Sequence, residues 1–296
     1  MPRLLELLVA ILAFWTVACA SNPTPRDPIT ESATVSGDGV SVRFRVAGAD
    51  HGEPTIVLVH GFACDSTFWN AQLRHLAETH RVVAVDLPGH GRSGMDRVDW
   101  TMEAFGDDVR AVCDEIGARH VVVVGHSMGG PVAVEAAKLM PDRVVAIVPV
   151  ETFHDVERRL NEEQLIELLA AWGEDFAGSA ERMVREFFFT KESDPDLVDR
   201  TVAKLRTMRP DIGLALLESM FRYDAAKSLE SVSVPVRVIN AADGQPTNVE
   251  AARRHARDCQ VRRIERVGHF PMLEAPATVN RLLDEIVAEV APPTKP

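Results

Sequence analysis

The chain has 296 residues, of which 46 % are hydrophobic and 26 % are charged, so it can bury a core and is not a disordered protein. Acidic residues outnumber basic ones by 44 to 32, which gives a net charge of −12 at pH 7. Because nucleic-acid binding needs a positive surface, this charge balance argues against a nucleic-acid partner.

The first twenty residues differ in composition from the rest of the chain. Arg3 is the only base among them, and residues 7–18 are apolar apart from Thr16. A helix of that length reaches about 18 Å, whereas a membrane span must cross about 30 Å of hydrocarbon. Residues 1–20 therefore predict an export signal and not a membrane anchor. The three prolines in residues 21–32 predict an extended tether after it.

Two cleavage patterns overlap at the end of this signal. Ala18-Cys19-Ala20 fits the small-x-small rule of a signal peptidase. The segment from Thr16 to Cys19 resembles a bacterial lipobox, in which Cys19 would be lipidated, although Thr16 replaces the usual aliphatic residue. We expect an exported protein, either a lipoprotein of the bacterial cell envelope or a periplasmic or secreted protein. Its only membrane contact would be a lipid on Cys19.

The other cysteines are Cys64, Cys113 and Cys259, which are far apart and lack the spacing of a metal site. No metal ligands are predicted from them. We expect free thiols packed as small apolar residues, and the alternative is one disulfide in an oxidising compartment.

Strands and helices are predicted to alternate through the first half of the chain. Residues 33–36 and 40–46 flank Gly37-Asp38-Gly39, which is typical of a β-hairpin. Uninterrupted apolar runs then predict buried strands, with helical periodicity between them. The predicted strands are Thr55–Val59, Arg81–Val85, Val121–Val124 and Val144–Val150, and the predicted helices are Ser66–Glu78, Thr101–Ile116 and Pro131–Leu139.

The alternation stops at Glu151 and resumes after Ser231. Residues 152–231 show helical patterns only, with many bulky aromatic side chains. Beyond them the pattern predicts strands Val236–Ile239 and Val261–Arg266 and helices Thr247–Arg257 and Ala277–Val290. Such alternation predicts an α/β core with a mostly parallel sheet, built from residues 33–151 and 232–296. The segment 152–231 is predicted to be a helical cap inserted over the active edge of that sheet.

Residues 125–130, Gly-His-Ser-Met-Gly-Gly, match the pattern G-x-S-x-G. The pattern follows a predicted strand and opens a predicted helix, which is the context in which such a serine is a nucleophile. Glycines on both sides allow the tight turn that lifts Ser127 above the sheet, and the helix N-terminus favours developing negative charge. The alternative, a glycine-rich turn with an incidental serine, is weakened by the flanking strand and helix.

With this motif the chain resembles the α/β-hydrolase family over about residues 40–290. The resemblance implies an eight-stranded, mostly parallel sheet with an inserted helical cap. His60-Gly61-Phe62 follows a predicted strand, and in this family the residue after His-Gly donates its backbone N–H to the oxyanion. Phe62 and Met128, the residue after the nucleophile, are therefore the expected oxyanion donors.

Two further segments carry the resemblance. Residues 86–93 look like the family's D-x-P-G-x-G-x-S loop, which we interpret as structural. Gly268-His269-Phe270-Pro271 follows the last predicted strand, where the family keeps its catalytic histidine. His269 is thus the expected general base for Ser127.

The acid that orients His269 has two candidates. Asp243 lies in the turn after Val236–Ile239, one residue before the family's commonest position, which Gly244 occupies. Glu151 ends the preceding strand, where certain haloalkane dehalogenases carry a glutamate. Asp243 is preferred, because an acid in a turn has room to reach the histidine. Glu151 would then be a hydrogen-bonding residue beneath His269 or a cap residue.

These features imply a serine hydrolase that cleaves an ester-like bond through a Ser127–His269–acid triad and an acyl-enzyme intermediate, without a cofactor. The alternatives are lactone or carbon–carbon bond hydrolysis or cofactor-free perhydrolysis on the same triad, or a ligand receptor that has lost turnover. The expected partner is a small molecule with an apolar acyl or aryl group, and no oligomeric state is predicted. The side chains expected near the pocket are His60, His126, His154 and Phe221.

Overall fold

A β-hairpin forms one edge of the sheet in the computed structural model, which describes residues 28–49 and 51–291. In this hairpin β1 (Thr30–Val35) pairs antiparallel with β2 (Ser41–Ala47). Because residues 30–32 pair with residues 44–46, the predicted tether, which ends at residue 32, is three residues too long. The predicted export signal and Cys19 lie outside the described residues.

The complete sheet has eight strands in the order β1-β2-β4-β3-β5-β6-β7-β8. β2 pairs antiparallel with β4 (Val82–Asp86), and every later pair is parallel. The predicted α/β fold with a mostly parallel sheet is therefore confirmed. The remaining strands are β3 (Thr55–Val59), β5 (Val121–His126), β6 (Val144–Val150), β7 (Val236–Ala241) and β8 (Cys259–Ile264).

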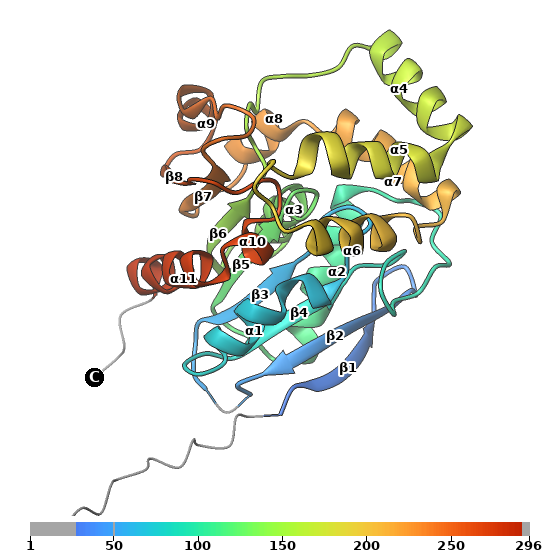
Figure 1. Cartoon of the computed structure of the whole chain (residues 1–296). Coiled ribbons are helices and arrows are strands. Elements are labelled where there is room, and N and C mark those ends of the chain that lie inside the picture. The colour runs from blue at the N-terminus through green and yellow to red at the C-terminus, as the bar shows by residue number, and fades with distance from the viewer. Residues whose placement is uncertain (1–27, 50, 292–296) are drawn as a thin grey trace, which may run out of the picture.

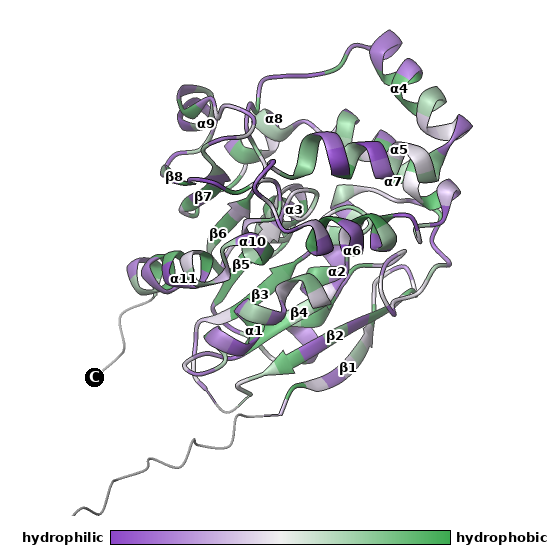
Figure 2. Ribbon diagram, viewed as in Figure 1, coloured by the Kyte–Doolittle hydropathy of each residue, from purple (hydrophilic) through white to green (hydrophobic). Residues whose placement is uncertain are grey.

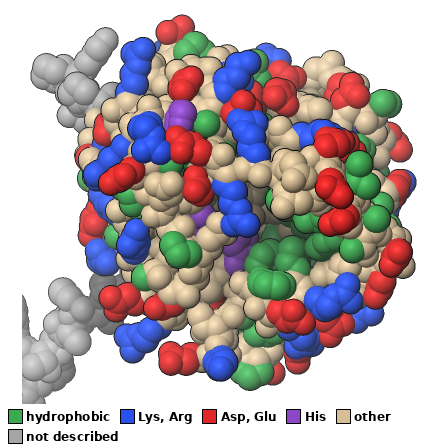
Figure 3. All heavy atoms as spheres, turned by 90° about the horizontal axis from the view of Figure 1, so that it is seen from above, with side chains coloured by type: hydrophobic (Ala, Val, Ile, Leu, Met, Phe, Trp, Pro, Cys, Tyr) green, Lys and Arg blue, Asp and Glu red, His purple; other side chains and the backbone are tan. Residues whose placement is uncertain are grey.

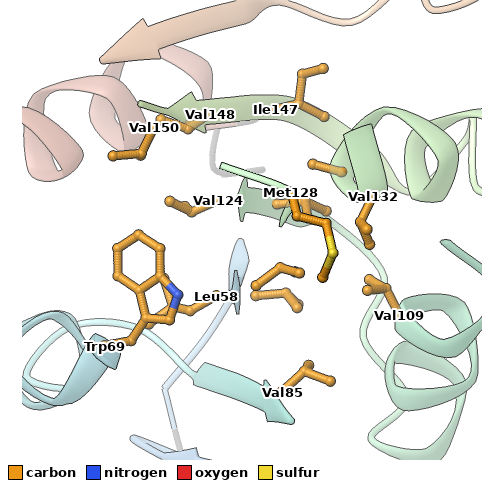
Figure 4. Packing of buried hydrophobic residues seen from close by; sticks show 14 of the residues in the cluster. Leu58, Trp69, Val85, Val109, Val124, Met128, Val132, Ile147, Val148 and Val150 are labelled. Carbon is orange, nitrogen blue, oxygen red and sulfur yellow. The ribbon is translucent and has the colours of Figure 1, made fainter. Parts of the chain in front are cut away.

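Helices cover both faces of the sheet, so the central strands are buried and can be apolar throughout (Figures 1 and 2). Figure 4 shows Trp69 on one side of these strands and Val109 on the other. One face carries η1 (Ser66–Trp69), α1 (Asn70–Leu76) and α11 (Pro276–Val290), and the other carries α2 (Met102–Glu115) and α3 (Gly129–Leu139). The short helix α10 (Pro271–Glu274), which the sequence pattern does not predict, leads into α11.

The cap is inserted between β6 and β7 and lies over the carboxyl ends of the parallel strands (Figure 1). It contains α4 (Glu162–Glu174), α5 (Phe176–Met183), the π-helix η2 (Val184–Phe188), α6 (Pro195–Leu205) and α7 (Pro210–Arg222). The last helix of the predicted cap, α8 (Ala225–Glu230), instead packs against α3 and α9 (Val249–His255) of the core. Within residues 28–49 and 51–291, no helix combines the length and hydrophobicity that a membrane span needs.

Candidate active site

Ser127 lies at the turn between β5 and α3. Its φ is 50°, a left-handed conformation that residues other than glycine rarely adopt. The Ser127 N–H donates to the carbonyl oxygen of Val150, and the Gly130 N–H donates to that of Ser127, both at 2.9 Å. A Cβ at Gly125 would lie 1.9 Å from the carbonyl oxygen of Gly129, so only glycine fits there. This turn holds Ser127 at the carboxyl end of the sheet.

The loop after β3 passes close to the same turn. A Cβ at Gly61 would lie 3.1 Å from the Cβ of Ser127, which places the next residue, Phe62, beside the serine. The backbone N–H groups of Phe62 and Met128 have no hydrogen-bond acceptor among the described residues. Met128 also stands at the N-terminus of α3, where the helix dipole favours negative charge. Two free donors beside a serine are what an oxyanion hole requires.

His269 lies between β8 and α10 and is held by two other elements. Its backbone N–H donates to the carbonyl oxygen of Phe188 in η2 (2.7 Å), and its imidazole stacks on the Phe188 ring with centroids 4.2 Å apart. Its carbonyl oxygen accepts from Nε2 of His126 on β5 (2.7 Å). A Cβ at Gly268 would lie 2.3 Å from the Phe188 carbonyl oxygen, so this approach requires glycine. The cap therefore helps to place His269.

Glu151 is the carboxylate that contacts His269. Its side chain is 5 % exposed, and its Oε2 lies 3.4 Å from Nδ1 of His269. Its Oε1 accepts from the backbone N–H of Ala241 at the end of β7. Burial alone would raise the pKa of Glu151, but hydrogen bonds from His154, His269 and Ala241 outweigh burial and lower the pKa to about 2. The carboxylate is therefore ionised at neutral and mildly acidic pH.

Asp243 does not occupy the place expected for it. It is exposed in the turn after β7, and its Oδ2 accepts from the backbone N–H of Arg266. This bond engages the Asp243 carboxylate with the loop backbone, whereas Nδ1 of His269 faces Glu151. The geometry thus does not support the preference for Asp243, and it favours Glu151, the alternative.

Ser127, Glu151 and His269 line one cavity of about 430 Å³. Figure 3, which looks down on the face that carries the cap, shows a hollow with hydrophobic side chains along one side and a histidine at its edge. The apolar lining includes Pro131, Phe153, Val156, Met220 and Phe221, and the polar lining includes His154, Asp155, Arg158, Arg159 and Gln245. A larger cavity of about 710 Å³ beside α6 and α10 does not include the serine. The smaller cavity is therefore the candidate substrate site.

Comparison with known proteins agrees with this geometry. A family model described as "Alpha/beta hydrolase family" matches residues 56–282. The chain belongs to the alpha/beta hydrolase family. The curated relatives of this hydrolase include the karrikin insensitive 2 receptor CA of Petunia hybrida, which is 28 % identical over 77 % of this chain and 89 % of the relative. Strigolactone esterase D14 of Arabidopsis thaliana is also 28 % identical, over 82 % of this chain and 95 % of the relative.

Solved structures show the same fold. A thermophilic esterase from Thermogutta terrifontis matches the hydrolase with a TM-score of 0.76 at 24 % identity, covering 90 % of this chain and 100 % of that one. A putative aryl esterase from Burkholderia cenocepacia matches with a TM-score of 0.75 at 23 % identity, covering 88 % and 99 %. At these identities the likeness establishes the fold alone.

Two of the four side chains expected near the pocket do not line the cavity of the hydrolase. His60 is buried, and its Nε2 accepts from the backbone N–H of Leu87 (3.0 Å) while Nδ1 donates to the carbonyl oxygen of Gly61 (2.8 Å). His126 is also buried and is bonded to the His269 carbonyl. Both histidines hold loops at the carboxyl edge of the sheet. His154 and Phe221 do line the cavity.

Three buried histidines are expected to make the hydrolase less stable in acid. Burial lowers the pKa of His60 and His90, and it lowers that of His126 to about 3. Below the unfolded-state pKa of about 6.5, the unfolded chain therefore binds protons that the folded chain does not. The contribution of these histidines to the free energy of unfolding should be highest above pH 6.5 and fall toward pH 5, by at most about 1.4 kcal/mol per pH unit for each histidine that stays neutral in the folded protein. Urea unfolding at pH 7.5, 6.5 and 5.5 measures this, and an unchanged midpoint would contradict it.

Sequence reasoning missed two residues that hold the site, Phe188 and Asn240. Phe188 is the middle one of three consecutive phenylalanines, and only the π-helical turn of η2 decides which of them reaches His269. Asn240 is fully buried near the end of β7, and a polar residue inside an otherwise apolar strand is a signal that could have found it. The described cysteines, Cys64, Cys113 and Cys259, are buried free thiols, as predicted.

Proposed function

We propose that this hydrolase is a serine esterase in which Ser127 is the nucleophile, His269 the general base and Glu151 the orienting acid. The observation that carries the proposal is the 3.4 Å contact between Nδ1 of His269 and Oε2 of Glu151, in the cavity that Ser127 also lines. Since Nδ1 faces the carboxylate, Nε2 is the nitrogen left to accept the serine proton. The free N–H groups of Phe62 and Met128 are the donors for the oxyanion.

The reaction follows from these positions. Oγ of Ser127 bonds to the ester carbonyl carbon while its proton passes to Nε2 of His269, and the carbonyl oxygen becomes an oxyanion. Collapse of this intermediate breaks the bond to the alcohol oxygen, which takes the proton from His269 and leaves as the alcohol. A water molecule then attacks the acyl-enzyme with His269 again as base, which releases the carboxylic acid and restores Ser127.

The cavity supports a small substrate with an apolar group. A cavity of about 430 Å³ has room for a small molecule, and its apolar side suits an acyl or aryl group. The names of two similar proteins, a strigolactone esterase and a putative aryl esterase, are consistent with this class. The likeness to a karrikin receptor supports the alternative, a protein that binds its ligand without turnover. The presence of a nucleophile, a base, an acid and two oxyanion donors argues against that alternative.

A series of p-nitrophenyl esters from acetate to octanoate tests the proposal. We expect hydrolysis with a rapid burst of p-nitrophenol that approaches one equivalent per enzyme when deacylation is the slower step. Rates should be higher for acyl chains that the cavity can hold. A receptor that has lost turnover would give at most one equivalent and no steady state, and that outcome would contradict the esterase.

We also propose that the enzyme is exported, with Cys19 as the residue that would carry a lipid. The composition of residues 1–20 and the cleavage patterns at residues 16–20 support this proposal.

A further inference from the structure

A second histidine approaches the carboxylate of Glu151. His154 lies just beyond β6, with its side chain only 12 % exposed, and its Nε2 is 3.5 Å from Oε2 of Glu151. The same oxygen lies 3.4 Å from Nδ1 of His269. Glu151 is thus flanked by two imidazoles, and the proposed triad uses only that of His269.

The buried amide of Asn240 determines which nitrogen of His154 carries the proton. Oδ1 of Asn240 lies 3.2 Å from the backbone N–H of Thr152, which can only donate, so the amide orientation is set. Nδ2 of Asn240 then lies 3.3 Å from Nδ1 of His154, and it also contacts Oγ1 of Thr247 (3.0 Å) and the carbonyl oxygen of Thr152 (3.2 Å). Because an amide nitrogen can only donate, the Nδ1 that faces it carries no proton. An imidazole without a proton on Nδ1 carries its proton on Nε2 when neutral, and Nε2 of His154 is the nitrogen that lies 3.5 Å from Oε2 of Glu151.

His154 is therefore unsuited to act as a second base. Nδ1 is occupied by Asn240, and Nε2 faces a carboxylate that is itself held by Ala241 on its other oxygen. What His154 can do is restrict the rotation of the Glu151 carboxylate and share its negative charge with His269.

We propose that His154 is a positioning residue of the triad: held by Asn240 in its Nε2-protonated form, it donates to Glu151 and keeps that carboxylate directed at His269. This proposal rests on the proposed function, since it assumes that Glu151 is the acid. The chain Asn240–His154–Glu151–His269 then extends the triad from the end of β7 to the loop after β8.

Losing the His154 donor should have two measurable effects. The carboxylate would be less well oriented, so kcat should fall by about 10- to 100-fold, as is typical when a residue that supports an active-site group is lost, with little change in KM. Without the hydrogen bond from His154, the negative charge of Glu151 would also interact more strongly with His269, which favours the imidazolium. The acidic limb of the kcat/KM profile should therefore move to higher pH.

The experiment compares His154→Leu with His154→Gln in the full-length enzyme. Glutamine places an Nε2–H donor the same number of bonds from Cβ as histidine does, so it should restore most of kcat and return the acidic limb toward its wild-type position. Asp155, Arg158 and Arg159 line the same cavity and are unchanged in both variants. His75→Leu is the matched control, because it removes a histidine paired with a carboxylate, Asp284, at the exposed surface.

The proposal would be overturned if the leucine and glutamine variants had the same kcat and the same pH profile. A change in KM alone would also contradict it, because His154 would then contact the substrate and not position Glu151. Labelling by a fluorophosphonate probe distinguishes this result from failure of the proposed esterase function. If Ser127 is the nucleophile, the probe must label it in every variant. If His154→Leu does not fold, His154→Phe serves in its place, because phenylalanine keeps the ring but has no donor and should reproduce the loss of kcat.

Discussion

Replacing Ser127 with alanine is expected to lower ester hydrolysis by about 10⁴-fold or more while the protein remains folded. The substitution removes only the hydroxyl, and the hydrogen bonds that close the turn are all made by the backbone. Only the covalent pathway through the acyl-enzyme is lost. Steady-state hydrolysis of a p-nitrophenyl ester, with circular dichroism as the check on folding, measures the effect.

Labelling with a fluorophosphonate gives an independent test of the nucleophile. The wild-type enzyme should be labelled, and Ser127→Ala should not. Ser219→Ala is a matched control, because this serine lies on α7 and lines a different cavity. Wild-type labelling of Ser127→Ala would remove this serine from the mechanism.

The second large effect is expected at Glu151. Glu151→Gln keeps the shape of the side chain but removes the charge that stabilises the imidazolium of His269, and the corresponding change in a related triad costs about 10⁴ in turnover. Asp243→Asn should cost less than about tenfold, because Asp243 is exposed and its carboxylate accepts from the Arg266 backbone. The kcat of both variants on the same ester, each checked for folding, decides between them.

The ratio of the loss of kcat in Glu151→Gln to that in Asp243→Asn decides which carboxylate is the acid. A larger loss for Asp243→Asn would return the acid to the turn after β7 and contradict the assignment of Glu151. Comparable losses would mean that the two carboxylates act together on His269. Because the pKa of Glu151 is lowered to about 2, its charge persists across any practical assay. Loss of activity on mild acidification should therefore not come from protonation of Glu151.

The parts of this site that local sequence determines could be predicted. Ser127 could be predicted from a G-x-S-x-G pattern between a strand and a helix. The turn leaves no room for a Cβ at either glycine of the pattern. His269 follows from its place after the last strand. The sheet itself follows from apolar runs whose residues prove to be buried on both faces.

The choice of the acid could not be made in the same way. β6 and β7 are neighbours in the sheet, and each is followed by a carboxylate that could reach the same loop. What separates Glu151 from Asp243 is non-local: Glu151 is bonded to Ala241 on the next strand, and Asp243 is bonded to Arg266 after β8. The contact between Phe188 and His269 is equally non-local, since it depends on where the cap lies over the core.

Two adjacent strands of this protein end in left-handed residues that are not glycine, Ser127 after β5 (φ 50°) and Glu151 after β6 (φ 49°). Each such residue costs about 1–3 kcal/mol, and a glycine would adopt the same backbone without that cost. Replacing the proposed nucleophile with glycine would consequently make the backbone more stable. Directed evolution that selects only for heat resistance would therefore favour glycine at these two positions and so enrich inactive variants. A search for thermostable catalysts must select for turnover in every round.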